Sequence, residues 1–152
     1  MGCWGEYPFQ HDQALDYWGS LRDIKSTSPS PVQRVVSVIV EAQTLEYIDD
    51  DVTQEILVGV VLVLGFTDRQ WLKNYPHLND YLRQQIKDFL TKNQADWDTL
   101  LKQTPDVYSQ SLTAMDKVTS PEISESYELW EGDKTWLASC DELKQALRQF
   151  TK

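Results

Sequence analysis

The residues most able to carry acid–base or metal chemistry in this chain are its two histidines, His11 and His77. Neither has a second His or a Cys at a spacing that would hold a metal ion. A histidine without an oriented partner is also a weak candidate for a general base. We therefore expect both side chains to be solvated and structural, with His11 just before a helix cap and His77 in the loop after Pro76.

Nucleophilic chemistry has equally little support. The two cysteines, Cys3 and Cys140, lie far apart in the sequence, and a reducing cytosol would keep both as thiols. Cys140 falls on an apolar helical stripe, which predicts a position in the core. No Cys-x-x-Cys pair, Gly-x-Ser-x-Gly turn or glycine-rich phosphate loop occurs. We expect no enzyme activity, no cofactor and no metal.

Carboxylates are the exception, because the chain has 24 of them. Asp49, Asp50 and Asp51 look like the start of a calcium loop. An EF-hand also needs a Gly at its sixth position and a Glu at its twelfth, and neither occurs in register. A pair of carboxylates suffices for glycoside hydrolysis. A carboxylate-based hydrolase is therefore an alternative, although no motif singles out a pair.

The charges are unevenly distributed along the chain. Between Arg34 and Arg69 there are seven acidic residues and no basic one, whereas residues 67–119 hold equal numbers of both signs. Four Glu recur every third residue near the end, so on a helix they are neighbours and repel by about 0.2 to 0.5 kcal/mol per pair. The expected partner-binding residues are Glu46, Asp49, Asp50, Asp51, Glu55, Glu122, Glu125, Glu128 and Glu131. The alternative is that these carboxylates favour helix N-termini and form a solvated face.

The net charge of −10 predicts the kind of partner. An acidic protein is repelled by nucleic-acid backbones and by anionic membrane surfaces, so neither is expected to bind. A cationic protein is the natural complement. The longest apolar run, residues 56–66, is shorter than the roughly 20 residues of a membrane helix, and the first residues lack a secretory signal pattern. We expect a cytoplasmic protein.

Helix signals recur along the chain and predict an all-α fold. Asp12 is expected to cap the first helix, and Ser30 with Gln33 forms a capping box for the second. The Val-rich run at residues 56–64 also suits a buried strand. Its length and a start at Asp51 favour a helix, and a helix that is apolar all round must be buried on every side.

The later helix starts follow from the same signals. The expected caps are Thr67, Asn93, Asp106, Ser120 and Asp133, with Gly132 as the left-handed residue that ends the helix before Asp133. No internal repeat or long linker divides the chain. We therefore expect one domain, residues 1–152, built as an irregular bundle of about eight helices around the buried central helix.

Two segments carry a family resemblance. Met1, Gly2, Trp4, Gly5, Phe9, Asp12, Ala14 and Asp16 match the pattern M-G-x-W-G-x-x-x-F-x-x-D-x-A-x-D, and Glu-Leu-Trp-Glu at residues 128–131 is followed by a Trp at 136. On these segments the chain resembles the bacterial domain-of-unknown-function family 4259. Tyr7 stands where that family usually has Gly. The resemblance implies a fold rather than an activity, and we expect Trp4 and Phe9 to anchor the terminus in the core.

Small acidic domains without catalytic groups are typical of immunity proteins, which neutralise bacterial toxins. Many such toxins are nucleases with basic surfaces, which an acidic inhibitor could cover. We therefore expect an immunity protein that binds a cognate toxin of a contact-dependent or secreted system. The alternatives are a regulatory or housekeeping interaction module without a toxin and, third, the carboxylate-based hydrolase.

Overall fold

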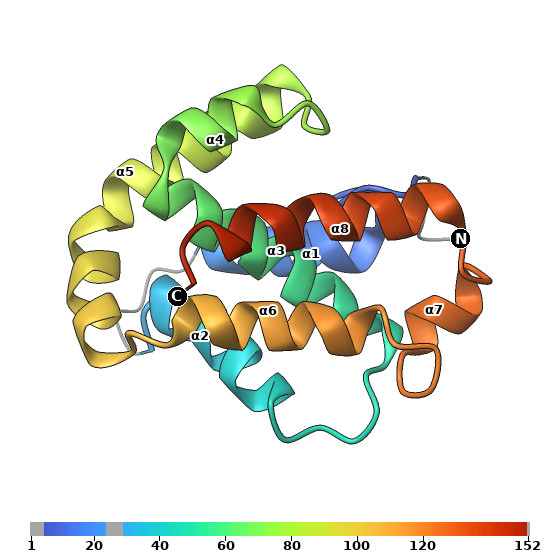
Figure 1. The fold of residues 1–152 in the computed structure, drawn as a ribbon. Helices are drawn as coiled ribbons and strands as arrows, with labels where there is room; N and C mark the ends of the chain where they lie inside the picture. Colours follow the sequence, from blue (N-terminus) through green and yellow to red (C-terminus); the bar gives the residue numbers. More distant parts are fainter. Residues whose placement is uncertain (1–4, 24–28, 152) are drawn as a thin grey trace.

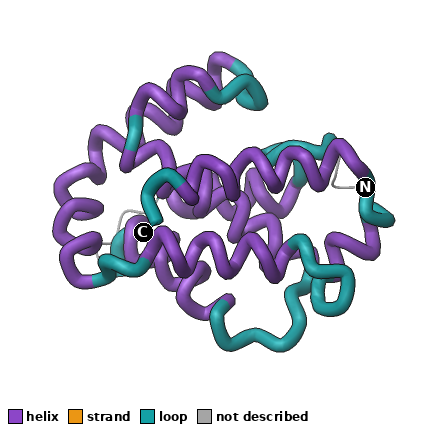
Figure 2. Tube along the Cα trace, viewed as in Figure 1, coloured by secondary structure: helices purple, strands orange, loops and turns teal. Residues whose placement is uncertain are grey.

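The computed structural model describes residues 5–23 and 29–151, which form a bundle of helices (Figure 1). The eight helices of these residues are α1 (Asp12–Arg22), α2 (Pro31–Ala42), α3 (Asp50–Thr67), α4 (Arg69–Asn74), α5 (Asp80–Gln103), α6 (Val107–Val118), α7 (Glu125–Leu129) and α8 (Lys134–Arg148). Figure 2 shows loops between them and no strand in the described residues; an isolated parallel bridge joins Ile48 to Ser124. The prediction of an all-α bundle is confirmed.

The apolar segment forms the central helix α3. The Asp49 side chain accepts a hydrogen bond from the Val52 amide at 2.8 Å, so the cap is Asp49 rather than Asp51. Every residue of 53–66 except Glu55 is buried. Helix α3 contacts each of the other seven helices, and in Figure 1 it lies in the middle of the molecule, behind α8. The prediction of a buried central helix is confirmed.

Helices α3 and α5 approach each other closely at Gly65. A Cβ atom on this residue would lie 2.7 Å from the Cδ1 atom of Leu90. Protein interiors are close-packed, so a larger side chain would have to displace Leu90. The absence of a side chain at Gly65 therefore allows α5 to lie directly against the central helix.

Three predicted helix starts are at the expected residues. Ser30 accepts a hydrogen bond from the Gln33 amide in a complete capping box, and Asp133 accepts one from the Trp136 amide. Asp106 holds the N-cap position of α6, but its side chain makes no cap hydrogen bond. The capping-box pattern and the Asp cap of α8 are confirmed by direct contacts.

Two other caps lie one residue from the prediction. Helix α1 is capped by His11 rather than Asp12, because the imidazole Nδ1 accepts the Gln13 amide at 3.1 Å. Helix α4 is capped by Asp68 rather than Thr67. Adjacent residues with acceptor side chains compete for the same orphan amides, and the sequence alone does not decide between them.

Helices α5 and α7 show the largest differences. The helix predicted to start at Asn93 is instead the second half of α5, which runs without a break from Asp80 to Gln103. Asn93 lies inside it and donates to the Phe89 carbonyl at 2.8 Å, a hydrogen bond that lets a polar residue occupy mid-helix. Helix α7 is capped by Ser124 rather than Ser120, because the Ser124 side chain accepts the Tyr127 amide. Ser120 begins the preceding turn, in which its carbonyl accepts the Ser124 amide.

The end of α7 is a left-handed turn. Glu131 and Gly132 both have positive φ, 53° and 64°. The Gly132 amide donates to the Tyr127 carbonyl and the Glu131 amide to the Glu128 carbonyl, each at 3.1 Å. In this Schellman pattern Glu131 occupies the position that usually favours glycine. The left-handed end is therefore confirmed at Gly132, but Glu131 begins it and carries the steric strain.

Aromatic rings anchor the N-terminal segment in the core. Phe9 is 3% exposed and meets Trp18 of α1 edge-on, with ring centroids 6.2 Å apart. Trp18 in turn contacts Phe89 of α5 at 5.1 Å. The predicted anchor at Phe9 is confirmed. The other predicted anchor, Trp4, lies outside the described residues, as does Cys3.

Candidate partner-binding surface

The two acidic segments singled out from the sequence lie side by side. The Ile48 amide donates to the Ile123 carbonyl at 2.8 Å, and the Ile48 carbonyl accepts the Glu125 amide at 2.9 Å. Ile48 itself is fully buried. This bridge fastens the loop between α2 and α3 to the start of α7, and so joins residues that are distant in the sequence.

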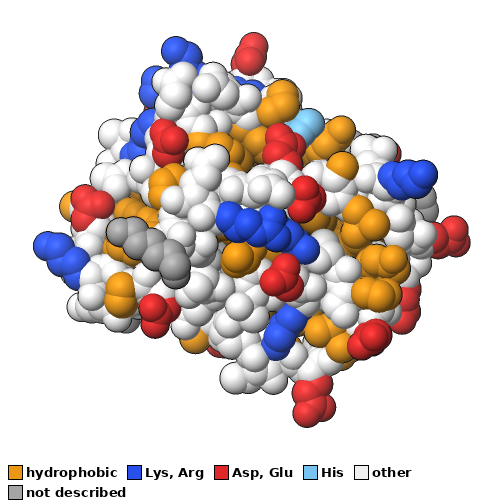
Figure 3. Space-filling view, in the orientation of Figure 1, with side chains coloured by type: hydrophobic (Ala, Val, Ile, Leu, Met, Phe, Trp, Pro, Cys, Tyr) orange, Lys and Arg blue, Asp and Glu red, His pale blue; other side chains and the backbone are white. Residues whose placement is uncertain are grey.

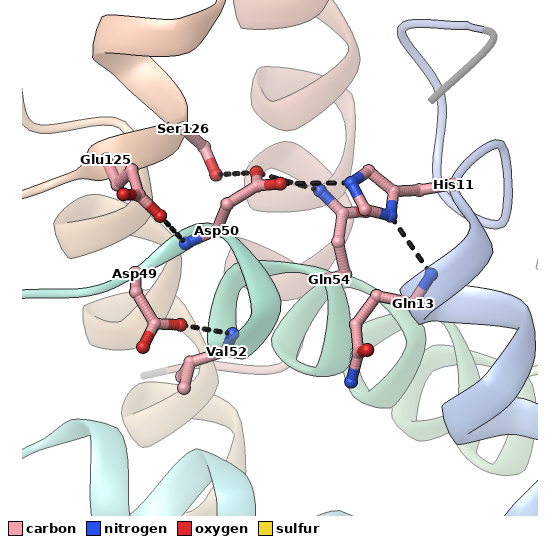
Figure 4. Close-up of polar contacts among 8 residues, drawn as sticks. All are labelled: His11, Gln13, Asp49, Asp50, Val52, Gln54, Glu125 and Ser126. Atoms are coloured by element: carbon pink, nitrogen blue, oxygen red, sulfur yellow. Dashed lines mark hydrogen bonds and ion pairs between the residues drawn. The ribbon is translucent and has the colours of Figure 1, made fainter. Parts of the chain in front are cut away.

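Asp50, one of the predicted partner-binding residues, points into the protein (Figure 4). Its carboxylate accepts hydrogen bonds from the Ser126 hydroxyl at 2.6 Å and the Gln54 side-chain amide at 3.4 Å. The Nε2 atom of His11 lies 2.9 Å from the same carboxylate. The Asp50 amide donates to Glu125 Oε1 at 2.8 Å. This cluster ties the N-terminal segment to α3 and α7.

His11 is a structural link, but the expectation that it is solvated and has no partner is wrong. Its side chain is 16% exposed. Because Nδ1 accepts the Gln13 amide, Nε2 is the nitrogen that can donate to Asp50. In this chain of contacts the carboxylate lies between Ser126 and the histidine, whereas activation of a serine needs the histidine in the middle. Ser126 is therefore a donor to Asp50.

His77 is also held more firmly than expected. Its ring stacks on Tyr7 with centroids 3.7 Å apart, and its Nε2 lies 2.9 Å from Glu142 Oε1. Its side chain is 19% exposed. The carboxylate partners of the two histidines are 39 and 65 residues away in sequence, which explains why local spacing did not reveal them.

Most of the other predicted binding residues face solvent. The exposed ones are Glu46, Asp49, Asp51, Glu122, Glu128 and Glu131, whereas Asp50, Glu55 and Glu125 are half-buried. None of the exposed six forms an ion pair within the described part of the chain. The structure therefore places six unpaired carboxylates on the two segments that Ile48 joins.

Lys117 reaches the same loop without neutralising these carboxylates. Its ammonium group donates to the carbonyls of Ala42, Gln43 and Leu45 at 2.8, 2.8 and 3.0 Å. Carbonyls at the end of a helix lack intrahelical partners, and here the lysine satisfies them. Lys117 thus fixes the backbone that leads from α2 to the acidic segment, a role that sequence reasoning missed.

Tyr47 lies among the carboxylates of both segments. Its side chain is 48% exposed. Desolvation raises the pKa of the Tyr47 hydroxyl above its ordinary value, and the negative charges of Glu128, Glu125 and Asp49 add to the effect. Leu129 of α7 is 63% exposed. Exposed aromatic and aliphatic side chains beside charges suit a protein interface. The sequence prediction missed both because it selected residues by charge.

We call the exposed side chains of the two segments the acidic surface: Glu46, Tyr47, Asp49, Asp51, Glu122, Glu128, Leu129 and Glu131. Figure 3 shows acidic and hydrophobic side chains together at the lower right, over α7. Glu55 lies nearby and accepts a hydrogen bond from Gln13 at 3.3 Å. Burial raises the pKa of the Glu55 carboxyl; that hydrogen bond opposes the shift, and the charges of Asp51, Asp49 and Glu41 add to it.

Three clefts lined by described residues give little support to chemistry by paired carboxylates. Each of these surface clefts carries one carboxylate, from Glu41, Glu142 and Asp80 respectively. The described residues also contain no group of three His, Cys, Asp or Glu side chains placed to hold a metal ion. Among the same residues, no helix combines the length and apolar character needed to cross a bilayer.

Comparison with known proteins places the chain in a family. Searches of curated proteins and of solved structures give no significant match. The profile of the family described as Domain of unknown function (DUF4259) matches residues 2–139. This range covers most of the chain and includes, except for Met1, the residues at both ends that carry the resemblance. The chain therefore belongs to the DUF4259 family.

Proposed function

We propose that the chain is a protein-binding module whose acidic surface covers a cationic patch on a partner. The partner is a cognate bacterial toxin, which the chain neutralises as an immunity protein. The observation that supports this proposal is the convergence of the two acidic segments around Tyr47, with six carboxylates that lack ion pairs in the described residues. A cationic partner would relieve the repulsion between these carboxylates.

The acidic surface also suits the energetics of protein binding. Unpaired surface charge steers a partner of opposite sign and raises its association rate, more strongly at low salt. Tyrosines that are exposed in the free protein and become buried at the centre of an interface commonly supply a large share of its binding free energy. The carboxylates should therefore control the association rate, and Tyr47 should control the dissociation rate.

The experiment begins with the product of the gene next to the one for this chain, because an immunity gene is expected directly after its toxin gene. The chain is immobilised and association is measured over a series of salt concentrations. The variant Asp49→Asn, Asp51→Asn, Glu128→Gln removes three charges, and Asn at position 49 can still cap α3. Its association rate should fall by about tenfold at low salt.

A control variant removes three charges elsewhere: Asp88→Asn, Asp96→Asn and Asp141→Asn. Its association rate should stay close to that of the wild type. An equal loss in both variants would mean that only net charge matters, and unchanged binding in the first variant would overturn the role of the acidic surface. Failure of the neighbouring gene product to bind would count against the immunity function.

The same two proteins can distinguish the immunity function from the second candidate, an interaction module without a toxin. Co-expression of the chain should restore growth of cells that produce the toxin. Binding that leaves the cells unprotected would favour a regulatory or housekeeping interaction module instead. The carboxylate-based hydrolase has less support, because each of the three clefts carries a single carboxylate.

A further inference from the structure

A cleft between α4 and α5 gathers positive charge in a chain whose net charge is −10. It encloses about 490 Å³ and is lined by Arg69, Lys73, Arg83 and Lys87, with Asp80 as its one carboxylate. Figure 3 shows Lys and Arg side chains gathered at the upper left, over these two helices. Four of the 14 Lys and Arg residues thus line a single hollow, which is locally positive although the molecule as a whole is negative.

Arg69 holds its charge beside neutral groups. Its Nη1 donates to the Gly65 carbonyl and its Nη2 to Gln94 Oε1, both at 2.7 Å. Burial lowers the pKa of the Arg69 guanidinium, and the charge of Asp98 opposes this. No carboxylate of the described residues lies within ion-pair distance of Arg69. A partly desolvated cation of this kind is stabilised when an anion binds next to it.

Arg83 is fixed on the other wall of the cleft. Its Nη1 donates to the Leu72 carbonyl at 2.6 Å and its Nη2 to the Leu78 carbonyl at 3.0 Å. These neutral acceptors belong to α4 and the loop after it, so the guanidinium is positioned before any ligand arrives. Lys73 and Lys87 are exposed, and within the described residues their ammonium groups have no hydrogen bond or ion pair. Both can turn toward a ligand.

We propose that this cleft binds a small, multiply charged oxyanion, such as a phosphate ester or a diphosphate. Two positioned guanidinium groups and two mobile ammonium groups match a ligand with several anionic oxygens. The volume is within the range of small-molecule sites, roughly 300 to 1,000 Å³. A long polyanion is disfavoured because the remainder of the surface would repel it.

The oxyanion site is independent of the proposed toxin binding. It lies on α4 and α5. The acidic surface lies on the loop before α3, the first turn of α3, and α7 with the residues next to it, on the opposite side of the molecule in Figure 1. A ligand here can be tested on the isolated chain, without a protein partner. Failure of the immunity function would leave this proposal untouched, and the reverse also holds.

The test measures binding of inorganic pyrophosphate to the full chain by calorimetry, with sodium chloride at equal ionic strength as the reference. Pyrophosphate should bind saturably, at one site. The variant Lys73→Gln, Lys87→Gln should lose affinity by about tenfold or more, which corresponds to about 1.4 kcal/mol. Both side chains are exposed, so the fold should be retained.

The matched control is Lys92→Gln, Lys102→Gln, which removes two exposed charges from α5 outside the cleft. Its affinity should equal that of the wild type. Inorganic phosphate and citrate serve as further probes, and tighter binding of pyrophosphate than of citrate would identify the ligand as a phosphate compound rather than a polycarboxylate. Absence of saturable binding by all three anions, or equal losses in both variants, would overturn the proposal.

Discussion

His11 and Asp50 are 39 residues apart in the sequence, yet His11 Nε2 lies 2.9 Å from the Asp50 carboxylate. The two side chains are 16% and 17% exposed. Asp50 also accepts the Ser126 hydroxyl, and so connects the N-terminal segment, α3 and α7. The exposed carboxylates of Asp49 and Asp51 flank this residue, and the contact therefore holds part of the acidic surface in place.

Replacement of Asp50 by Asn should destabilise the fold. An amide offers one acceptor oxygen where the carboxylate offers two, so one of the donors Ser126 and His11 would lose its partner. The free energy of unfolding in urea should fall by about 1 to 3 kcal/mol. Asp141→Asn is the control, because Asp141 is exposed and should change stability by no more than about 0.5 kcal/mol. Equal effects of the two variants would contradict the structural role of Asp50.

Replacement of Glu131 by Gly should stabilise the protein. Glu131 has a φ of 53° in the turn after α7, a conformation that costs less for glycine than for any residue with a Cβ atom. Urea unfolding should show a gain of about 0.5 to 1 kcal/mol. Glu128→Gly places the same change inside α7 and should lower stability by about 1 kcal/mol. A loss of stability in Glu131→Gly would show that its side chain contributes more than the strain costs.

The thiol of Cys140 should be unreactive in the folded protein. Burial raises its pKa to about 12, although the charge of Lys144 partly opposes the shift. At pH 8 very little of the thiol is then ionised, and the thiolate is the species that reacts. In a Cys3→Ser background, iodoacetamide should modify Cys140 slowly in buffer and rapidly in denaturant. Fast modification of the native protein would mean that this part of α8 opens readily.

Much of the fold was predictable because helix signals are local. The Ser30–Gln33 capping box, the Asp133 cap and the apolar run of α3 can each be recognised in one short stretch of sequence, and all are confirmed. The prediction of a helix start at Asn93 was wrong, because a residue that often caps helices can also lie inside one and donate to a carbonyl of the preceding turn. The prediction of Asp12 as the cap of α1 was wrong, because a ring nitrogen of the adjacent His11 takes that role.

The site was less predictable because its contacts are long-range. Charge alone identified both acidic segments, but the Ile48 bridge that brings them together has no sequence signature. The exposure of Tyr47 likewise depends on the fold. The cationic cleft lies in a stretch where the charges balance along the sequence, and only the fold, which packs both α4 and α5 on α3, brings Arg69 and Arg83 into one hollow.

The ionisation of Glu55 makes the stability of the protein depend on pH. Burial raises the pKa of this carboxyl in the folded protein above its usual 4.5, and Asp51 and Asp49 add to the shift. The folded state therefore binds the proton more tightly than the unfolded state does. The resulting stabilisation is complete below the unfolded pKa and is lost as the pH rises through the folded pKa. At neutral pH the ionised Glu55 is thus a source of instability.

Glu55→Gln should accordingly raise the melting temperature at pH 7, because it removes the charge and keeps an acceptor for Gln13. The gain should be small, since solvent screens a half-exposed group. It should shrink as the pH falls through the raised pKa of the folded state and vanish well below 4.5, where the wild-type carboxyl is protonated in both states. Thermal unfolding between pH 4 and 7 measures the trend, with the exposed Glu46→Gln as the control for loss of one surface charge. A gain in Glu55→Gln that grows toward acid pH would contradict the raised pKa, because only a carboxyl that ionises more readily in the folded state gives that slope.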